Sequence, residues 1–203
     1  YLLFTLPFFS IGAMPVREFF SAFFDVLVLI AILFFEEKKV DIAIFESGIG
    51  GAHGSISLLP DLVSAITSIG LDHCEQLGNT LESIAIDKAG IAQSNSTLIV
   101  ANSINEPLQK VIKETISPKN ITFLLTENRR SFSIPRLDSL GFFYMINEQR
   151  IALQPSLKGR FQFQNLDLVI EIWRFLLSKK ISSYYDKDNN FHNCIGILHV
   201  NEE

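Results

Sequence analysis

Apolar residues in this chain fall into short runs that are separated by longer segments with helical spacing. Four of the runs have the length and the charged, proline or glycine borders of buried strands; they lie at residues 40–45, 62–69, 97–101 and 121–125. Apolar positions at helical spacing predict helices at residues 17–38, 79–90, about 107–116 and about 161–178. Strands that alternate with helices predict the α/β class, with a mostly parallel sheet flanked by helices.

Cap and turn residues sharpen some of these boundaries. Asn79 with Glu82 three residues later is a variant of the capping box, and Gly90 is a typical helix stop. Residues 142–146 and 150–153, on either side of Asn147-Glu148, predict a β-hairpin. The apolar pattern is lost over residues 181–203. We therefore predict one domain over residues 1–178 and a linker or divergent tail over residues 179–203.

Composition and charge exclude several classes of protein. The chain has 203 residues, 48% of them apolar, which is enough for a full core. Its net charge of −5 argues against nucleic acid as a partner, because phosphate binding needs concentrated positive charge. Cys74 and Cys194 are the two cysteines, far apart in sequence, so no disulfide framework is expected. This usage is typical of a reducing compartment and predicts a cytoplasmic protein.

The stretch Phe19–Phe35 is the one serious candidate for a membrane span, since its length approaches the minimum of roughly 17 residues. Asp25 interrupts the stretch, and a mixed-charge segment, Glu36–Lys39, closes it without a cationic bias. The helix predicted at residues 17–38 is apolar nearly all round. We therefore expect a buried helix of an α/β protein and no membrane partner.

Two polar residues follow predicted strands at the point where ligands gather in parallel sheets. Glu46 ends the first strand and enters a glycine turn, and His73 follows the second strand. Together they offer an oxygen and a nitrogen to a divalent cation. Each also has an ordinary interpretation, Glu46 as a solvated acid in a tight turn and His73 as a hydrogen-bonded polar residue. Cys74 raises a zinc alternative, which lacks a second cysteine or histidine at zinc spacing.

Lys88 occupies a position where a core residue is expected. On the helix predicted at residues 79–90, Leu81, Ile84, Ala85 and Ala89 form one apolar stripe, and Lys88 falls on the same stripe. A lysine there either extends along the edge to solvent or is held in a polar pocket. Spacing alone favours the first arrangement.

The glycine turn also suggests a dinucleotide-binding loop, with Asp72 as the acid that binds ribose. The third glycine of G-x-G-x-x-G falls at His53, and the segment that should begin a helix contains Ser55, Ser57 and Pro60. A helix within residues 50–62 would favour this alternative. No G-x-x-x-x-G-K-[ST] phosphate loop occurs in the chain.

Three motifs together resemble the folylpolyglutamate synthase/dihydrofolate synthase family, a branch of the Mur ligase superfamily. Val40–Gly51 matches the family pattern V-D-x-A-x-x-E-x-G-L-G-G. Ile66–His73 matches I-T-S-I-G-L-D-H, and Leu77–Ile91 matches L-G-x-T-L-x-x-I-A-x-x-K-A-G-I. A weaker match to L-x-G-x-H-Q-x-x-N lies at Leu157–Asn165. The resemblance implies a Mur ligase central domain, similar to P-loop NTPases and truncated at its N-terminus, over residues 1–178.

By resemblance, the function is an ATP-dependent carbon–nitrogen ligase that adds L-glutamate to folate or dihydropteroate through an acyl phosphate. Glu46 and His73 match the magnesium-site positions, and Lys88 matches a catalytic lysine that is carbamylated in this superfamily. Gln162 and Asn165 match positions near the adenine. The resemblance thus implies ATP and Mg²⁺ as ligands, and a monomer.

Some positions depart from the family pattern. The family's R-L-D-A-T-N is here Ala52–Ser57, so its aspartate and asparagine are replaced. The family's phosphate loop lies upstream of the matched region, and its C-terminal ligase domain follows it. We expect these 203 residues to be inactive alone, because a nucleotide site needs that loop to hold a triphosphate in line. We also expect the complete gene to encode a Gly-Lys-Ser/Thr loop before Tyr1. The alternative is a non-catalytic member of the family.

Overall fold

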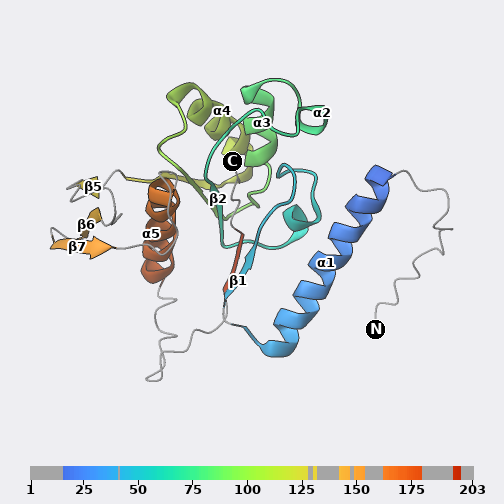
Figure 1. Ribbon diagram of the computed structural model, residues 1–203, viewed down its shortest axis with the longest axis horizontal. Coiled ribbons are helices and arrows are strands. Elements are labelled where there is room, and N and C mark those ends of the chain that lie inside the picture. Colours follow the sequence, from blue (N-terminus) through green and yellow to red (C-terminus); the bar gives the residue numbers. More distant parts are fainter. Residues whose placement is uncertain are drawn as a thin grey trace, which may run out of the picture. The chain divides into compact units, whose positions relative to one another are not determined.

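A computed structural model describes the backbone of residues 16–40, 42–127, 130–131, 142–146, 149–153, 162–179 and 194–197. Side chains are described for residues 23–40, 42–127 and 164–179. The chain divides into two compact units, Tyr1–Lys38 and Lys39–Glu203. Figure 1 shows the order of the elements along the chain.

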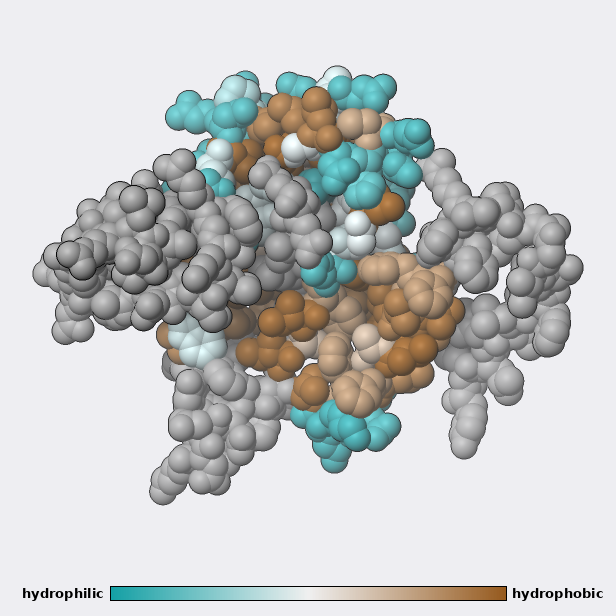
Figure 2. All heavy atoms as spheres, in the orientation of Figure 1, coloured by the Kyte–Doolittle hydropathy of each residue, from teal (hydrophilic) through white to brown (hydrophobic). Residues whose placement is uncertain are grey.

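Helix α1, Val16–Lys38, is the described part of the first unit and matches the helix expected at residues 17–38. Within the described residues most of its large apolar side chains are exposed, and the expected burial of this helix stays a prediction. Val28 is buried, whereas seven others are between 45% and 56% exposed: Phe23, Val26, Leu27, Leu29, Ile30, Leu33 and Phe34. A helix that is apolar on every side needs neighbours on every side to be buried. Figure 2 shows its apolar surface ending at a hydrophilic patch.

No helix within the described part of the chain is both long and apolar enough to span a membrane.

The central sheet of the second unit has three parallel strands in the order β2-β3-β4. They are Val63–Ile66, Thr97–Val100 and Thr122–Leu125, and each matches an apolar run predicted to be a strand. All four residues of β2 and of β3 are buried. Strands buried on both faces read as continuous apolar runs, which is why the sequence revealed them.

Helices connect these strands and cover both faces of the sheet. Helices α3, Leu81–Ala89, and α4, Glu106–Ile116, follow β2 and β3. Buried residues of these helices, of the segments next to them and of one face of β2 and β3 form one cluster: Ile66, Ala85, Ala89, Ala92, Leu98, Val100, Ile104, Leu108, Ile112 and Ile116. Helix α5, Gln162–Ser178, contributes Leu168 and Leu176 to a second cluster on the alternate face, with Val63, Ala65 and Ile99. The predicted α/β class is confirmed.

The N-terminus of α3 differs from the expected capping box. The N-cap is Thr80, whose side chain accepts a hydrogen bond from the Ser83 amide at 3.1 Å, while the Ser83 side chain accepts from the Thr80 amide. The prediction that Asn79 and Glu82 form the box is wrong by one residue. A capping box usually has glutamate or glutamine at the third helical position. Here Ser83 stands at that position, and the neighbouring Glu82 made Asn79 look like the cap.

Strand β1, Ile42–Phe45, pairs in parallel with β8, Cys194–Ile197, and Ile42 is opposite Cys194. Strand β8 also contacts β2. We predicted no strand in this part of the chain, because the run is four residues long and contains Gly196, which is weakly strand-forming. The boundary of the predicted tail at residue 179 stays a prediction.

A separate antiparallel sheet contains β5, Arg130–Ser131, β6, Phe142–Ile146, and β7, Gln149–Leu153. Ile146 pairs with Gln149, which confirms the predicted hairpin. Its turn, Asn147-Glu148, lies outside the described residues. Strand β5 was not predicted, since two residues give no periodic signal.

Candidate functional site

Lys88 lies on the buried side of α3, in the last turn of the helix. Its neighbours on the stripe, Ile84, Ala85 and Ala89, are fully buried, and Lys88 itself is 4% exposed. The interpretation that its side chain extends to solvent is therefore wrong. Burial lowers the pKa of Lys88 from 10.5 to about 8, against the opposing effect of the carboxylates of Asp72 and Asp87.

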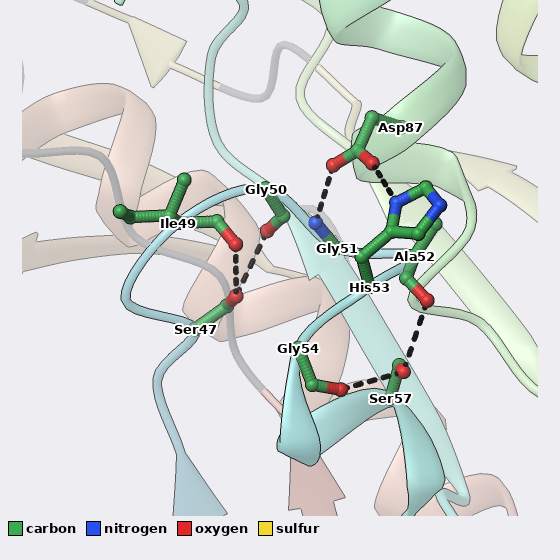
Figure 3. A network of polar contacts seen from close by, with 9 residues as sticks. All are labelled: Ser47, Ile49, Gly50, Gly51, Ala52, His53, Gly54, Ser57 and Asp87. Atoms are coloured by element: carbon green, nitrogen blue, oxygen red, sulfur yellow. Dashed lines mark hydrogen bonds and ion pairs between the residues drawn. The ribbon is translucent and has the colours of Figure 1, made fainter. Parts of the chain in front are cut away.

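Asp87 connects the glycine turn after β1 to this helix. Its Oδ2 accepts a hydrogen bond from the Gly51 amide at 2.7 Å, and its Oδ1 lies 2.8 Å from Nδ1 of His53 (Figure 3). The side chain of Asp87 is 11% exposed, whereas that of His53 is 90% exposed. The turn is thus held on α3 one residue before Lys88.

Two of the turn glycines allow the close approach to α3. A Cβ at Gly51 would lie 2.6 Å from the Lys88 carbonyl oxygen, and a Cβ at Gly50 would lie 2.1 Å from Oδ2 of Asp87. Gly50 also has a φ of +64°, a conformation that favours glycine. The sequence suggested positive φ or contact with an anion; the structure shows positive φ and contact with a helix.

A serine closes the same turn. The Ser47 hydroxyl donates to the Gly50 carbonyl oxygen at 2.8 Å, and Ser47 is buried (Figure 3). Glu46 precedes Ser47, directly after the carboxyl end of β1, and is exposed. The position of Glu46 is therefore set by a turn that is bonded both within itself and to α3.

His73 lies after β2 and begins the four-residue helix α2, Cys74–Leu77, which we had not predicted. Its φ is +49°, and its amide donates to Oδ1 of Asp72 at 2.7 Å. The His73 side chain is 42% exposed. The negative charge of the Asp72 carboxylate favours the charged form of Lys88 and so raises the pKa of this amine.

The structure thus brings the glycine turn of the first motif to the last turn of α3, which belongs to the third motif. That the side-chain tips of Glu46, His73 and Lys88 meet in one cavity stays a prediction. Asn165 lies half-buried in the first turn of α5. Gln162 is the first residue of α5, and its side chain lies outside the described residues. Their place near an adenine also stays a prediction.

Glu46 and His73 are the donors that the sequence offered to a divalent cation, with Cys74 as a zinc alternative. Among the residues whose side chains are described, no group of three or more His, Cys, Asp or Glu is arranged to hold an ion. A structural zinc site needs four such ligands, whereas Mg²⁺ keeps several waters and is bound through one or two carboxylates and substrate phosphates. The side chain of Glu46 is exposed, and its binding to Mg²⁺ stays a prediction.

The dinucleotide alternative does not gain support from the loop after the glycines. A helix within residues 50–62 is the feature that would favour it. The loop contains only a 3₁₀ turn, Ser55–Leu58, and no α-helix begins at the glycines. The Ser57 hydroxyl instead donates to the carbonyl oxygens of Gly54, at 2.7 Å, and Ala52, at 3.2 Å.

Asp87 was not among the predicted site residues. Its role depends on Gly51 and His53, which lie 36 and 34 positions away in the sequence, so no local pattern marks it. The one local feature that could have pointed to Asp87 is its place next to Lys88, which lies on a buried stripe.

A family model described as Mur ligase middle domain matches residues 21–172. The chain belongs to this family, and the fold that the three motifs implied is confirmed. It is 42% identical over 92 residues to "Dihydrofolate synthase/folylpolyglutamate synthase" of Bacillus subtilis (strain 168), a match that covers 45% of this chain and 21% of that protein. It is 29% identical over 153 residues to "Folylpolyglutamate synthase" of Lacticaseibacillus casei, which covers 73% of this chain and 35% of that protein.

Solved structures give the same assignment. The apo form of L. casei FPGS has a TM-score of 0.63 and 27% identity, and the match covers 72% of this chain and 36% of that one. Folylpolyglutamate synthase from Thermotoga maritima has a TM-score of 0.59 and 25% identity, over 73% of this chain and 34% of that one. The chain therefore matches between 21% and 36% of the length of the relatives named here.

Proposed function

We propose that this chain contributes the central domain of an ATP-dependent ligase that joins L-glutamate to folate or dihydropteroate. The relatives named above support the reaction class. A solved structure of similar fold, with a TM-score of 0.63, is described as an FPGS–AMPPCP–folate complex, which supports ATP and a folate as ligands.

The proposed reaction has two steps. A carboxylate oxygen of the folate or pteroate attacks the γ-phosphorus of ATP, the bond to the β-phosphate oxygen breaks, and ADP leaves. The amino nitrogen of glutamate then attacks the acyl phosphate carbon, inorganic phosphate leaves, and the nitrogen loses a proton. Both steps depend on positioning and on cations that offset phosphate charge.

The observation that carries the proposal is the burial of Lys88 in the last turn of α3, directly beside the glycine turn. With a pKa of about 8, roughly a tenth of the Lys88 amines are neutral at pH 7, far more than for an exposed lysine. A neutral amine can attack carbon dioxide, forming an N–C bond and releasing a proton. The carbamate that results is an anion. Its formation would explain why a lysine with a catalytic role lies on an apolar stripe.

In the same proposal, Glu46 and His73 hold Mg²⁺, while Gln162 and Asn165 lie near the adenine. When bound, the ion offsets charge on the phosphates of ATP. The exposure of Glu46 and His73 supports a metal that is shared with a bound ligand. We further propose a cytoplasmic monomer without a nucleic acid or membrane partner. The net charge of −5 supports the exclusion of nucleic acid.

A second candidate is a family member that keeps the fold without catalysis. The loop at residues 52–57 favours it, because Ser57, which stands where the family has asparagine, is buried and donates to carbonyl oxygens of its own loop. A hydroxyl used in this way is not available to a substrate.

A glutamate-incorporation assay on the complete gene product tests the two candidates. With ATP, Mg²⁺ and dihydropteroate or tetrahydrofolate, we expect ADP release that requires both the pterin substrate and glutamate. Glu46→Gln and Lys88→Met are expected to lower kcat by at least about a hundredfold, while Leu58→Ala, at a side chain 83% exposed, leaves it unchanged. Nucleotide binding without ADP release would favour the non-catalytic candidate, and activity in Lys88→Met equal to the wild type would remove the role of the carbamate.

A further inference from the structure

We infer that Asp87 is a positioning residue, which holds the glycine turn of residues 47–53 on helix α3 and so fixes Glu46 relative to Lys88. Its catalytic consequence rests on the proposed function. Its structural part, the attachment of the turn, does not.

The two oxygens of Asp87 have different partners on the turn. Oδ2 accepts from the Gly51 amide at 2.7 Å, and Oδ1 lies 2.8 Å from the His53 ring nitrogen (Figure 3). A hydrogen bond to a carboxylate is stronger than one to a neutral acceptor, and the side chain of Asp87 is nearly buried. The exposed pair with His53 contributes less, because solvent screens it.

The shape of the turn leaves little freedom once Asp87 holds it. No Cβ fits at Gly50 or at Gly51, so the backbone lies directly on the helix. Ser47 closes the turn through the Gly50 carbonyl oxygen. Covalent chain and hydrogen bonds thus run from Glu46 through Ser47, Gly50 and Gly51 to Asp87, one residue before Lys88.

Asp87 also acts on Lys88 directly. Its carboxylate raises the pKa of the amine and opposes the larger effect of burial. Asp87 therefore affects both the position of Glu46, through the glycine turn, and the pKa of Lys88. An aspartate that only capped or stabilised α3 would do neither.

The test compares variants of the complete gene product by hydrogen exchange. In Asp87→Ala, we expect the amides of residues 48–53 to exchange at least about tenfold faster than in the wild type, since the Gly51 amide loses a charged acceptor. Asp87→Asn, which keeps an acceptor oxygen, should give a smaller increase. His53→Leu is the matched control and should change exchange less than about threefold.

Ligation kinetics separate positioning from a stability role. We expect Asp87→Ala to raise the Mg²⁺ concentration for half-maximal rate at least about fivefold and to shift the pH profile of the rate to lower pH. A residue that only stabilises the fold would lower the amount of active protein and leave both quantities unchanged. His53→Leu should retain the wild-type values.

Each outcome decides one part of the inference. Unchanged exchange at residues 48–53 in both Asp87 variants would overturn it, whether or not the protein ligates glutamate. Faster exchange with unchanged Mg²⁺ dependence and pH profile would overturn the catalytic part. A wild-type protein without ligase activity would contradict the proposed function, while the exchange result would still decide whether Asp87 holds the turn. If Asp87→Ala fails to fold, the exchange of Asp87→Asn decides.

Discussion

Gly51 lies so close to Lys88 that a Cβ at Gly51 would be 2.6 Å from the Lys88 carbonyl oxygen. The neighbour is helix backbone, which cannot move aside as a flexible side chain can. Hydrogen bonding from the Gly51 amide to Asp87 draws the two segments together at the same point. The glycine turn is therefore a packing element of the site.

Gly51→Ala should lower the free energy of unfolding by about 1–3 kcal/mol, because the methyl group forces the turn away from α3. Urea denaturation of the wild type and the variant measures the difference. Gly54→Ala is the matched control, since Gly54 has a φ of −86° and a Cβ there would meet no atom within 4 Å beyond the adjoining residues. It should be neutral or stabilising by less than about 1 kcal/mol. Equal losses in both variants would contradict the close contact.

Stability should rise with pH through the titration of Lys88. Its pKa is about 8 in the folded chain and near 10.5 in the unfolded chain, so between these values the unfolded chain binds more protons. The burial cost is fully present below pH 8 and is relieved by pH 10.5, a change on the order of 3 kcal/mol.

Lys88→Met should remove this contribution and leave a flatter dependence on pH. Urea unfolding at several pH values between 7 and 10.5 checks it, with Lys110→Met, at an exposed position, as the control. The same slope in wild type and Lys88→Met would show that the lysine is not held in a low-polarity environment.

Thr80→Ala should destabilise the protein by about 1 kcal/mol, because it removes the acceptor for the Ser83 amide at the start of α3. Asn79→Ala, one residue earlier and exposed, should cost less than about 0.5 kcal/mol. Thermal unfolding of the two variants distinguishes the observed cap from the one that the sequence suggested. The reverse order of stability would restore Asn79 as the cap.

Two isoleucines on α3 offer a paired test of the core. Ile84 is fully buried and Ile86 is 50% exposed, although they lie two residues apart on one helix. Ile84→Ala should cost about 2–5 kcal/mol by creating a cavity in the core, and Ile86→Ala less than about 1 kcal/mol. Denaturant unfolding measures both, and similar losses would mean that the helix face is assigned wrongly.

The sequence predicted the strands of the central sheet because burial on both faces leaves continuous apolar runs. Residues 97–101 and 121–125 became β3 and β4 with boundaries shifted by one residue. It did not predict α2, whose start depends on the positive φ of His73. Such a short element is decided by local backbone geometry, which apolar periodicity does not report.

The site was predictable where one element carries the signal. The spacing of apolar residues showed that Lys88 lies on the apolar stripe of α3. Its burial could not be predicted, because spacing does not show which other segments pack against the helix. Asp87 was missed because its partners come from a turn more than thirty residues earlier. Contacts between distant segments depend on tertiary structure.

The pairing of β1 with β8 has a consequence for how the protein is made. Ile42 is opposite Cys194, 152 positions later, and β8 is the strand hydrogen-bonded to β1 among those described. At roughly 5–20 residues per second, a ribosome needs on the order of ten seconds or more to supply that partner. Until β8 is synthesised, the strand that leads to Glu46 lacks the partner to which it is hydrogen-bonded in the folded protein. We expect a chaperone to protect β1 most during this period.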